Sequence, residues 1–254
     1  MDIAITRDIP QSILRCELTH LDREPIDYER AVTQHEAYCQ VLSDLGLSLQ
    51  RLPADEAYPD CPFVEDTAVV LDELAILASP GVVSRRGEVT SIARILSRYR
   101  PLSRIEPPAT LEGGDVLVMG RTIFVGKSSR TNVAGIAALA KFVGYFGYRV
   151  RPIEVAGCLH LKSAVTALDS ETVLLNPAWI DRGALAELRI VEVAPEEPGA
   201  ANVLSVRDTV LAHPGYPRTL ERIVAAGYRV APVDISEFLK AEAALTCKSL
   251  LLRS

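Results

Sequence analysis

The sequence lacks the features that mark several large classes of protein. It has no apolar run of the roughly 18 residues that span a bilayer, and its first residues, MDIAITRDIP, contain no apolar core of a secretory signal. Positive charge is not in excess either, because 27 Lys and Arg stand against 33 Asp and Glu and the net charge is −6. Without a basic field to hold nucleic acid, we expect a cytoplasmic protein with neither a nucleic-acid nor a membrane partner.

Cysteine is present, but in no arrangement that indicates a disulfide framework or a zinc site. The number of cysteines is odd, and none of them belongs to a CxxC pair or to a Cys/His spacing typical of metal ligands. Without a signal peptide we expect reduced thiols, each of which would ordinarily be a small buried apolar side chain. The five are Cys16, Cys39, Cys61, Cys158 and Cys247.

What the sequence does contain is a repeat. A segment that is first polar and then apolar leads through a two-residue turn into a second apolar segment, a pattern that predicts a β-hairpin. The predicted first strands are FVEDTAVVL from Phe63, TLEGGDVLVM from Thr110, CLHLKSAVTAL from Cys158, AANVLSV from Ala200 and LTCKSLLL from Leu245. Their partners are LAILASP, TIFVGKS, TVLLNP and TVLAHP, and ITRDIP near the N-terminus is predicted to complete the last pair.

Helical segments follow the hairpins. Residues 85–99 place Val89, Ile92 and Leu96 on one face, as an amphipathic helix requires. Other signals are Pro217 as a first helical residue, and glycines that follow predicted helix ends. The predicted helices cover residues 28–45, 85–99, 131–146 and 217–226.

The polar parts of the hairpins recur at an even spacing. Taken as equivalent, Glu65, Glu112, His160, Asn202 and Cys247 stand 47, 48, 42 and 45 residues apart. Five such units fill the chain. We therefore predict a single catalytic domain, residues 1–254, with an α/β fold: a five-fold pseudosymmetric propeller of ββαβ-type units around a central channel. The alternative is an α+β sandwich in which the spacing is accidental.

Each of these polar residues also has an ordinary structural interpretation. His160 and Cys247 lie beside apolar runs, and each taken by itself would be interpreted as a core residue. Glu112 in LEGGDV is placed to accept hydrogen bonds from amides that the Gly-Gly turn exposes. A closed ring would instead bring the carboxylate, the imidazole and the thiol to one place. Their common place in the repeat favours a functional site.

Six motifs in this order resemble one family. FVEDTAVV, SRRGE, TLEGGDVLVMG, GKSSRTN, LHLKS and LTCKS are similar to segments of the dimethylarginine dimethylaminohydrolases, members of the guanidine-modifying pentein superfamily with its five-fold α/β propellers. The resemblance covers nearly the whole chain. It implies hydrolysis of Nω-methylated L-arginine (asymmetric dimethylarginine or monomethylarginine) to L-citrulline and dimethylamine or methylamine, a small-molecule substrate, and no metal or other cofactor.

The expected chemistry needs a thiolate, because a guanidinium carbon is a poor electrophile. Cys247 would attack this carbon, and His160 would protonate the departing amine and then activate the water that hydrolyses the covalent thiouronium intermediate. Glu112 would orient and stabilise the imidazole. These three residues are the predicted catalytic set.

The resemblance also implies substrate contacts. Carboxylates suit a guanidinium, and arginines suit an α-carboxylate because their donors are planar and paired. The implied residues are Asp66 at the guanidinium with Glu65 in support, Asp60 at the α-amino group, Arg85 and Arg130 at the α-carboxylate, and Leu18 in a mobile lid whose carbonyl reaches the amine.

Two positions bear on the choice of substrate. Relatives that deiminate free arginine typically have His-x-Asp, whereas this chain has Lys162 in HLK, which leaves room for N-methyl groups. Before the nucleophile the family usually has Asp-Gly, whereas this chain has Glu242-Ala243. Because Ala enters the positive-φ region less readily than Gly, we expect this loop to follow a different path.

Other interpretations remain open. The enzyme alternatives are arginine deiminase and amidinotransferase, and the non-enzymatic one is a binding propeller like the ribosome anti-association factor of the same architecture. We expect a monomer or a homodimer. Of the remaining residues, Cys158 is predicted to share a strand face with His160, Cys61 to lie near the pocket mouth, and His20, His35 and His213 to be surface or loop residues.

Overall fold

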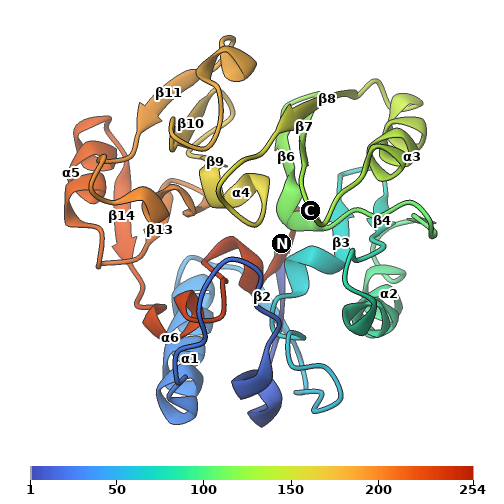
Figure 1. Ribbon diagram of the computed structural model, residues 1–254, viewed down its shortest axis with the longest axis horizontal. Helices are drawn as coiled ribbons and strands as arrows, with labels where there is room; N and C mark the ends of the chain where they lie inside the picture. The colour runs from blue at the N-terminus through green and yellow to red at the C-terminus, as the bar shows by residue number, and fades with distance from the viewer. Residues whose placement is uncertain (1, 254) are drawn as a thin grey trace.

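The computed structural model describes residues 2–253 and contains five three-stranded sheets that follow one another around a common centre (Figure 1). In every sheet the middle strand pairs antiparallel with one neighbour and parallel with the other. The predicted α/β propeller of five units is therefore confirmed. No helix among the described residues is long and apolar enough to cross a membrane.

The elements have the following bounds. The sheets are β15 (Leu250–Leu252), β1 (Ile3–Arg7) and β2 (Ser48–Leu52); β3 (Ala68–Val70), β4 (Ala75–Leu77) and β5 (Leu102–Arg104); β6 (Val116–Met119), β7 (Thr122–Lys127) and β8 (Arg149–Glu154); β9 (Val165–Ala167), β10 (Thr172–Leu175) and β11 (Arg189–Glu192); and β12 (Leu204–Val206), β13 (Thr209–Ala212) and β14 (Arg229–Pro232). The α-helices are α1 (Tyr28–Asp44), α2 (Val89–Leu96), α3 (Val133–Gly144), α4 (Leu161–Ala164), α5 (Pro217–Ala225) and α6 (Ser236–Leu239). The 3-10 turns are η1 (Gln11–Arg15), η2 (Val64–Thr67), η3 (Val83–Glu88), η4 (Gly113–Asp115), η5 (Arg182–Leu185), η6 (Pro198–Ala201) and η7 (Thr246–Lys248).

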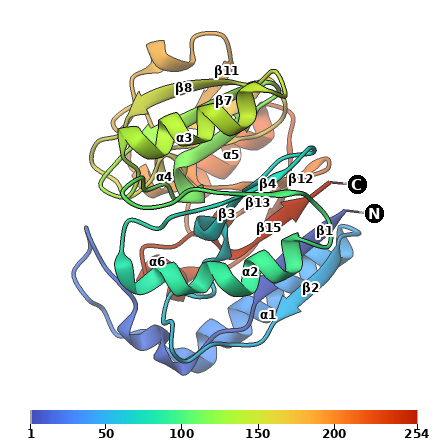
Figure 2. The ribbon, with the colours of Figure 1, turned by 90° about the vertical axis from the view of Figure 1, so that its right-hand side faces the viewer.

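The two ends of the chain share one sheet. Strand β1 pairs antiparallel with β15, with Ile3 opposite Leu252, and parallel with β2. Figure 2 shows these three strands side by side with the termini close together. The prediction that the N-terminal segment completes the last hairpin is therefore confirmed, and the pairing joins the last unit to the first.

The polar parts of the predicted first strands are not strands. They form the short helical turns η2, η4, α4, η6 and η7, and the strands begin only at the apolar residues that follow. An extended strand would point alternate side chains away from the centre, whereas a tight turn directs neighbouring polar side chains toward it. Cys158 lies in a bend before α4, so the prediction that it shares a strand face with His160 is wrong.

The five polar residues taken as equivalent are not in one register. Asn202 stands two residues before β12, whereas His160 stands five residues before β9. The spacing therefore predicted the number of units correctly, but not a common position within them, because His160 precedes its turn α4 whereas Asn202 follows its turn η6.

Three of the predicted helices match α1, α3 and α5 to within two residues at either end. Gly46 follows α1 with a φ of +83°, as expected for a residue beyond a helix end. The predicted helix 85–99 is wrong in its first part, which is the turn η3, where Arg85 and Glu88 point inward and pair. His35 was expected at the surface, but it is 1% exposed on the inner side of α1.

The apolar core lies in the seams between units. Helix α3 buries Ile136, Leu139 and Val143 together with Ile76 of the preceding sheet, and α2 packs in the same way against residues that include Ile5. The larger helices lie on the outside of the ring (Figure 1). Because apolar packing occurs between sheets and helices, the centre of the ring is left to polar side chains.

Asn132 joins α3 to its neighbours and gives a test of the fold. Its Oδ1 accepts from the amides of Gly135 (2.8 Å) and Thr110 (3.1 Å), and its Nδ2 donates to the carbonyl of Pro108. Loss of such a cap costs about 1–2 kcal/mol, so we expect Asn132→Ala to lower the free energy of unfolding by about this amount in urea titrations. Asn132→Asp keeps the acceptor and should retain most of that stability. Equal losses in the two variants would show that the cap contributes little.

Candidate active site

The turns that precede the inner strands meet at the centre of the ring. Turn η2 packs against η4 and η7, and α4 packs against η4 and η6. Between them lies a cavity, and six of the nine predicted site residues line it. The lining consists of Glu17, Asp60, Phe63, Asp66, Arg85, Arg130, Leu159, His160, Ala241, Glu242, Ala243 and Cys247.

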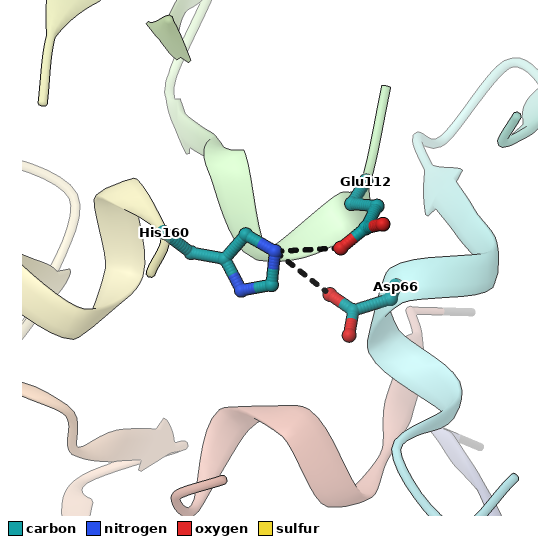
Figure 3. Close-up of side chains that lie close together, drawn as sticks. All are labelled: Asp66, Glu112 and His160. Atoms are coloured by element: carbon teal, nitrogen blue, oxygen red, sulfur yellow. Dashed lines mark hydrogen bonds and ion pairs between the residues drawn. The ribbon is translucent and has the colours of Figure 1, made fainter. Parts of the chain in front are cut away.

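His160 is held by two carboxylates from other units. Its Nε2 lies 2.7 Å from Oε2 of the fully buried Glu112 and 3.9 Å from Oδ1 of Asp66 (Figure 3). Burial lowers the pKa of His160, but the nearby carboxylates of Asp66, Asp115 and Glu112 outweigh it and raise the pKa to about 9. The imidazole is therefore protonated at neutral pH and can act as an acid.

Glu112 does not bind the amides of the Gly-Gly turn, so its ordinary structural interpretation is wrong. Its Oε1 accepts from the amide of Gly81 at 2.9 Å, whereas the amide of Gly114 donates to Asp66. A Cβ on Gly114 would lie 2.7 Å from Nδ1 of His160. Glycine is needed at this position because the imidazole approaches the backbone closely.

Arg85 is a buried member of an ion network. Its Nη1 lies 2.7 Å from Oδ2 of Asp66, and its Nε and Nη2 donate to the two carboxylate oxygens of Glu88. Nη2 also donates to the carbonyl of Phe63, which leaves one N–H on Nη1 without a partner among residues 2–253. Burial raises the pKa of Glu88 to about 7 although Arg85 opposes this. The sequence analysis did not identify Glu88.

Arg130 is also buried, at 5% exposure, so neither arginine is a surface charge. Its Nη1 lies 3.6 Å from Oε1 of Glu112, and its Nη2 donates to Oγ1 of Thr19 at 2.8 Å. Arg130 therefore connects the carboxylate that holds His160 to the N-terminal segment above the cavity.

Glu65 lies behind the cavity and does not line it. Its two carboxylate oxygens accept from Nζ of Lys162 and from Oγ1 of Thr246, both at 2.6 Å. Burial raises the pKa of Glu65, although Lys162 opposes this. Since Thr246 directly precedes Cys247, Glu65 anchors the turn that carries the thiol.

Asn202 and Asp115 hold the surrounding backbone, and neither was predicted to have a role. The amide of Asn202 donates to the carbonyl of Lys162 and to Oγ1 of Thr246, and its Oδ1 accepts from the amide of Thr246. Asp115 accepts from the amide of Leu161 at 2.9 Å. The even spacing of the repeat was the one signal in the sequence that pointed to Asn202.

Cys247 is partly buried and lines the cavity together with His160. Its Sγ accepts a hydrogen bond from the amide of Ala244 at 3.4 Å. Burial, together with the charges of Glu65 and Asp66, raises the pKa of the Cys247 thiol to about 12. The cysteine is therefore a thiol, not a thiolate, until another positive charge enters the site.

The other two cysteines singled out in the sequence lie outside the cavity lining. Sγ of Cys158 donates to the carbonyl of His160 at 3.4 Å, and the residue packs in an apolar cluster. Sγ of Cys61 donates to the carbonyl of Asp55, and the side chain is buried and does not line the cavity, although the neighbouring Asp60 does.

The segment 17–24, called the lid below, has no regular secondary structure and reaches the cavity through Glu17. The amide of Glu17 donates to Oδ2 of the buried Asp60 at 3.1 Å. Leu18 is half-buried and packs on a cluster that includes Ala243, but it does not line the cavity. The segment thus reaches the cavity with Glu17 and not with Leu18, and a role as a mobile lid stays a prediction.

Asp66, Glu112 and His160 bring potential metal-ligand atoms within 4.8 Å of one another. Arg85 and Arg130 already contact the two carboxylates, and Nε2 of His160 is engaged by Glu112. A cation would have to displace a proton from a histidine whose pKa is about 9 and lie beside two guanidinium groups. The arrangement fits a bound proton better than a metal ion.

The raised pKa of His160 makes the stability of the fold depend on pH. Because its pKa is about 9 in the folded protein and about 6.5 when exposed, its contribution is complete below pH 6.5 and disappears as the pH rises through 9. We expect His160→Gln to remove this dependence, so that the difference in unfolding free energy between wild type and variant shrinks by up to about 3 kcal/mol over this range. Urea titrations at several pH values measure it, and parallel curves would contradict it.

Known proteins resemble this chain along most of its length. Residues 19–182 match the family model described as N,N dimethylarginine dimethylhydrolase, eukaryotic. The N(G),N(G)-dimethylarginine dimethylaminohydrolase of Pseudomonas aeruginosa is 35% identical over 88% of this chain and 89% of its own length. The protein of the same name from Streptomyces coelicolor is 40% identical over 93% and 91%.

Solved structures show the same similarity to this family. A mutant of the Pseudomonas aeruginosa enzyme complexed with citrulline has a TM-score of 0.94 and 33% identity, and covers 98% of both chains. The N-terminal domain of a cyanobacterial arginine dihydrolase, 19% identical, has a TM-score of 0.89 over 98% of this chain and 97% of its own, which shows the fold alone. Since the family model spans more than half of the chain and both curated relatives exceed 30% identity, this protein belongs to the dimethylarginine dimethylaminohydrolase family.

Proposed function

We propose that the chain hydrolyses Nω-methylated L-arginine to L-citrulline and dimethylamine or methylamine, with residues 1–254 acting as a single catalytic domain. One observation carries the proposal: the buried Glu112–His160 pair lies at the same cavity as the thiol of Cys247. The citrulline complex of the Pseudomonas aeruginosa relative supports the product. The acidic and basic side chains that line the cavity suit a small zwitterionic substrate with a guanidinium group.

The substrate itself supplies the charge that the thiol needs. A guanidinium beside Asp66 offsets the carboxylates that raise the pKa of Cys247, and the thiol then releases its proton to water, because His160 is already protonated. The thiolate attacks the central guanidinium carbon and forms a C–S bond. The amide of Ala244, which donates to Sγ, helps to hold the charged sulfur toward this carbon.

His160 moves the protons of both half-reactions. As an imidazolium it gives its proton to the methylated nitrogen, the C–N bond breaks, and the amine leaves a thiouronium group on Cys247. The neutral imidazole then takes a proton from water, whose oxygen attacks the same carbon. The C–S bond breaks, and citrulline leaves. Glu112 keeps the imidazole in place and stabilises its charged form.

The amino-acid end of the substrate is placed by the residues around the lid. Arg130 supplies most of the hydrogen-bond donors to the α-carboxylate, because all but one of the N–H groups of Arg85 are already bonded to protein oxygens. Asp60 binds the α-amino group beside the lid, and Leu18 presents its backbone there. The pairing of Glu65 with Lys162 removes a free carboxylate from the guanidinium end, which favours a methylated nitrogen over an unmethylated one.

Assays with three substrates test this function. We expect citrulline from asymmetric dimethylarginine and from monomethylarginine, with kcat/KM at least about tenfold above that for arginine, a difference of about 1.4 kcal/mol. Greater turnover of arginine would favour the deiminase alternative. Formation of an amidinated amine in place of citrulline would favour the amidinotransferase.

Replacement of the nucleophile distinguishes an enzyme from a binding protein. We expect Cys247→Ser to lower kcat by at least about a thousandfold, because a hydroxyl is a far weaker nucleophile toward a guanidinium carbon. Cys158→Ser is the matched control, since its side chain can still donate to the carbonyl of His160, and it should retain most activity. Citrulline formation at the wild-type rate by Cys247→Ser would refute the mechanism. Monomeric or dimeric state and cytoplasmic location stay predictions.

A further inference from the structure

The carboxylate of Glu242 binds three consecutive amides of the lid. Its Oε2 accepts from Thr19 at 2.8 Å, and its Oε1 accepts from His20 and from Leu21, the latter at 2.6 Å. Hydrogen bonds from neutral donors to a carboxylate are stronger than those between neutral groups. Apart from Arg130 and Asp60, Glu242 is the main polar connection between the lid and the cavity wall.

Glu242 makes these bonds from an unfavourable backbone conformation. Its φ is +54°, in the left-handed region, where a side chain costs roughly 1–2 kcal/mol relative to the ordinary helical region. The lid amides offset this cost by binding its side chain. The amide of Glu242 also donates to the carbonyl of Leu239 at 3.2 Å, so the end of α6 and the lid together hold the backbone at residue 242.

The same loop carries the hydrogen bond to the nucleophile. Ala243 follows Glu242 and donates to the carbonyl of Phe238 at 3.0 Å, and the next amide, that of Ala244, donates to Sγ of Cys247. The residue that holds the lid and the amide that binds the thiol are two positions apart. A change of φ at 242 reorients the peptide units that follow it.

We propose that Glu242 is a positioning residue that couples closure of the lid to the orientation of the Ala244 N–H toward Cys247. With the lid closed, three amides keep Glu242 in the left-handed conformation, and the Ala244 amide points at the sulfur. With the lid open, only the backbone hydrogen bonds at the end of α6 oppose the strain, and the loop relaxes more easily, so that the thiolate is best supported when the cavity is covered. The inference rests on the proposed function, because it concerns activation of Cys247.

Two substitutions separate the steps of this coupling. Glu242→Ala removes the carboxylate and retains a side chain that resists positive φ, whereas Glu242→Gly removes the carboxylate but adopts positive φ without cost. Both variants should free the lid. If strain at residue 242 is the link, the Ala244 amide should stay closer to its native position in Glu242→Gly than in Glu242→Ala.

Amide hydrogen exchange of the unliganded protein gives the direct readout. We expect exchange at Thr19, His20 and Leu21 to increase by about tenfold or more in both variants, and exchange at Ala244 to increase several-fold in Glu242→Ala but little in Glu242→Gly. Steady-state kinetics should show KM for the methylated substrate raised in both variants and kcat lowered more by Glu242→Ala. Exchange does not need turnover, so a failure of the proposed function and a failure of the coupling are distinguishable.

The chain offers a matched control. Glu56 accepts from the amides of Gln11 and Ser12 at 2.7 and 2.9 Å, but it lies outside the cavity lining. Glu56→Ala should raise exchange at those two amides and leave Ala244 and kcat unchanged. Unaltered exchange of the lid amides in both Glu242 variants would show that Glu242 does not hold the lid. Equal effects of the two variants on Ala244 exchange and on kcat would overturn the coupling.

Discussion

Burial of several charges at one point is the constraint on which the centre of the molecule depends. Removing a charged group from water costs several kcal/mol unless a partner is close and well oriented. Asp66 and Glu112 meet this requirement through Arg85, Arg130 and His160, which come from three of the five units. Each arginine pairs with a carboxylate of its own unit, whereas His160 contacts carboxylates of two other units. Alignment of the units is therefore needed to place the imidazole, and the paired groups together define the cavity.

One carboxylate, that of Asp66, acts on two proton-carrying groups with opposite chemical consequences. Together with Asp115 and Glu112 it raises the pKa of His160, and together with burial and Glu65 it raises the pKa of Cys247, so that the imidazole is charged and the thiol is neutral. A charged imidazole is ready to donate, whereas a neutral thiol is unreactive. Both groups are thus protonated in the site as it stands, and under the proposed function the cationic substrate favours the thiolate.

Much of this arrangement could be predicted from the sequence, because strand pairs and their spacing reflect short-range patterns of apolar residues. The number of units, the completion of the last sheet by ITRDIP and the convergence on Cys247 and His160 followed from those patterns. The short turns could not be predicted, because η2 and η4 are stabilised by contacts with other units and not by the conformational preferences of their own residues. The role of Glu88 and the burial of Arg85 could not be predicted for the same reason. In the sequence, an ion pair that faces the interior cannot be distinguished from charged residues at the start of an exposed helix.

The position of Cys247 within the chain has a consequence for how the central cavity is completed. Cys247 precedes β15 by three residues, and β15 is held in its sheet by β1, which is made first. Bringing these strands together closes a loop of almost the entire chain, the step with the largest loop-closure entropy in the fold. The thiol therefore reaches its place beside His160 only when this closure brings η7 to the other units, so the units that hold His160 and Glu112 can form before the centre is complete.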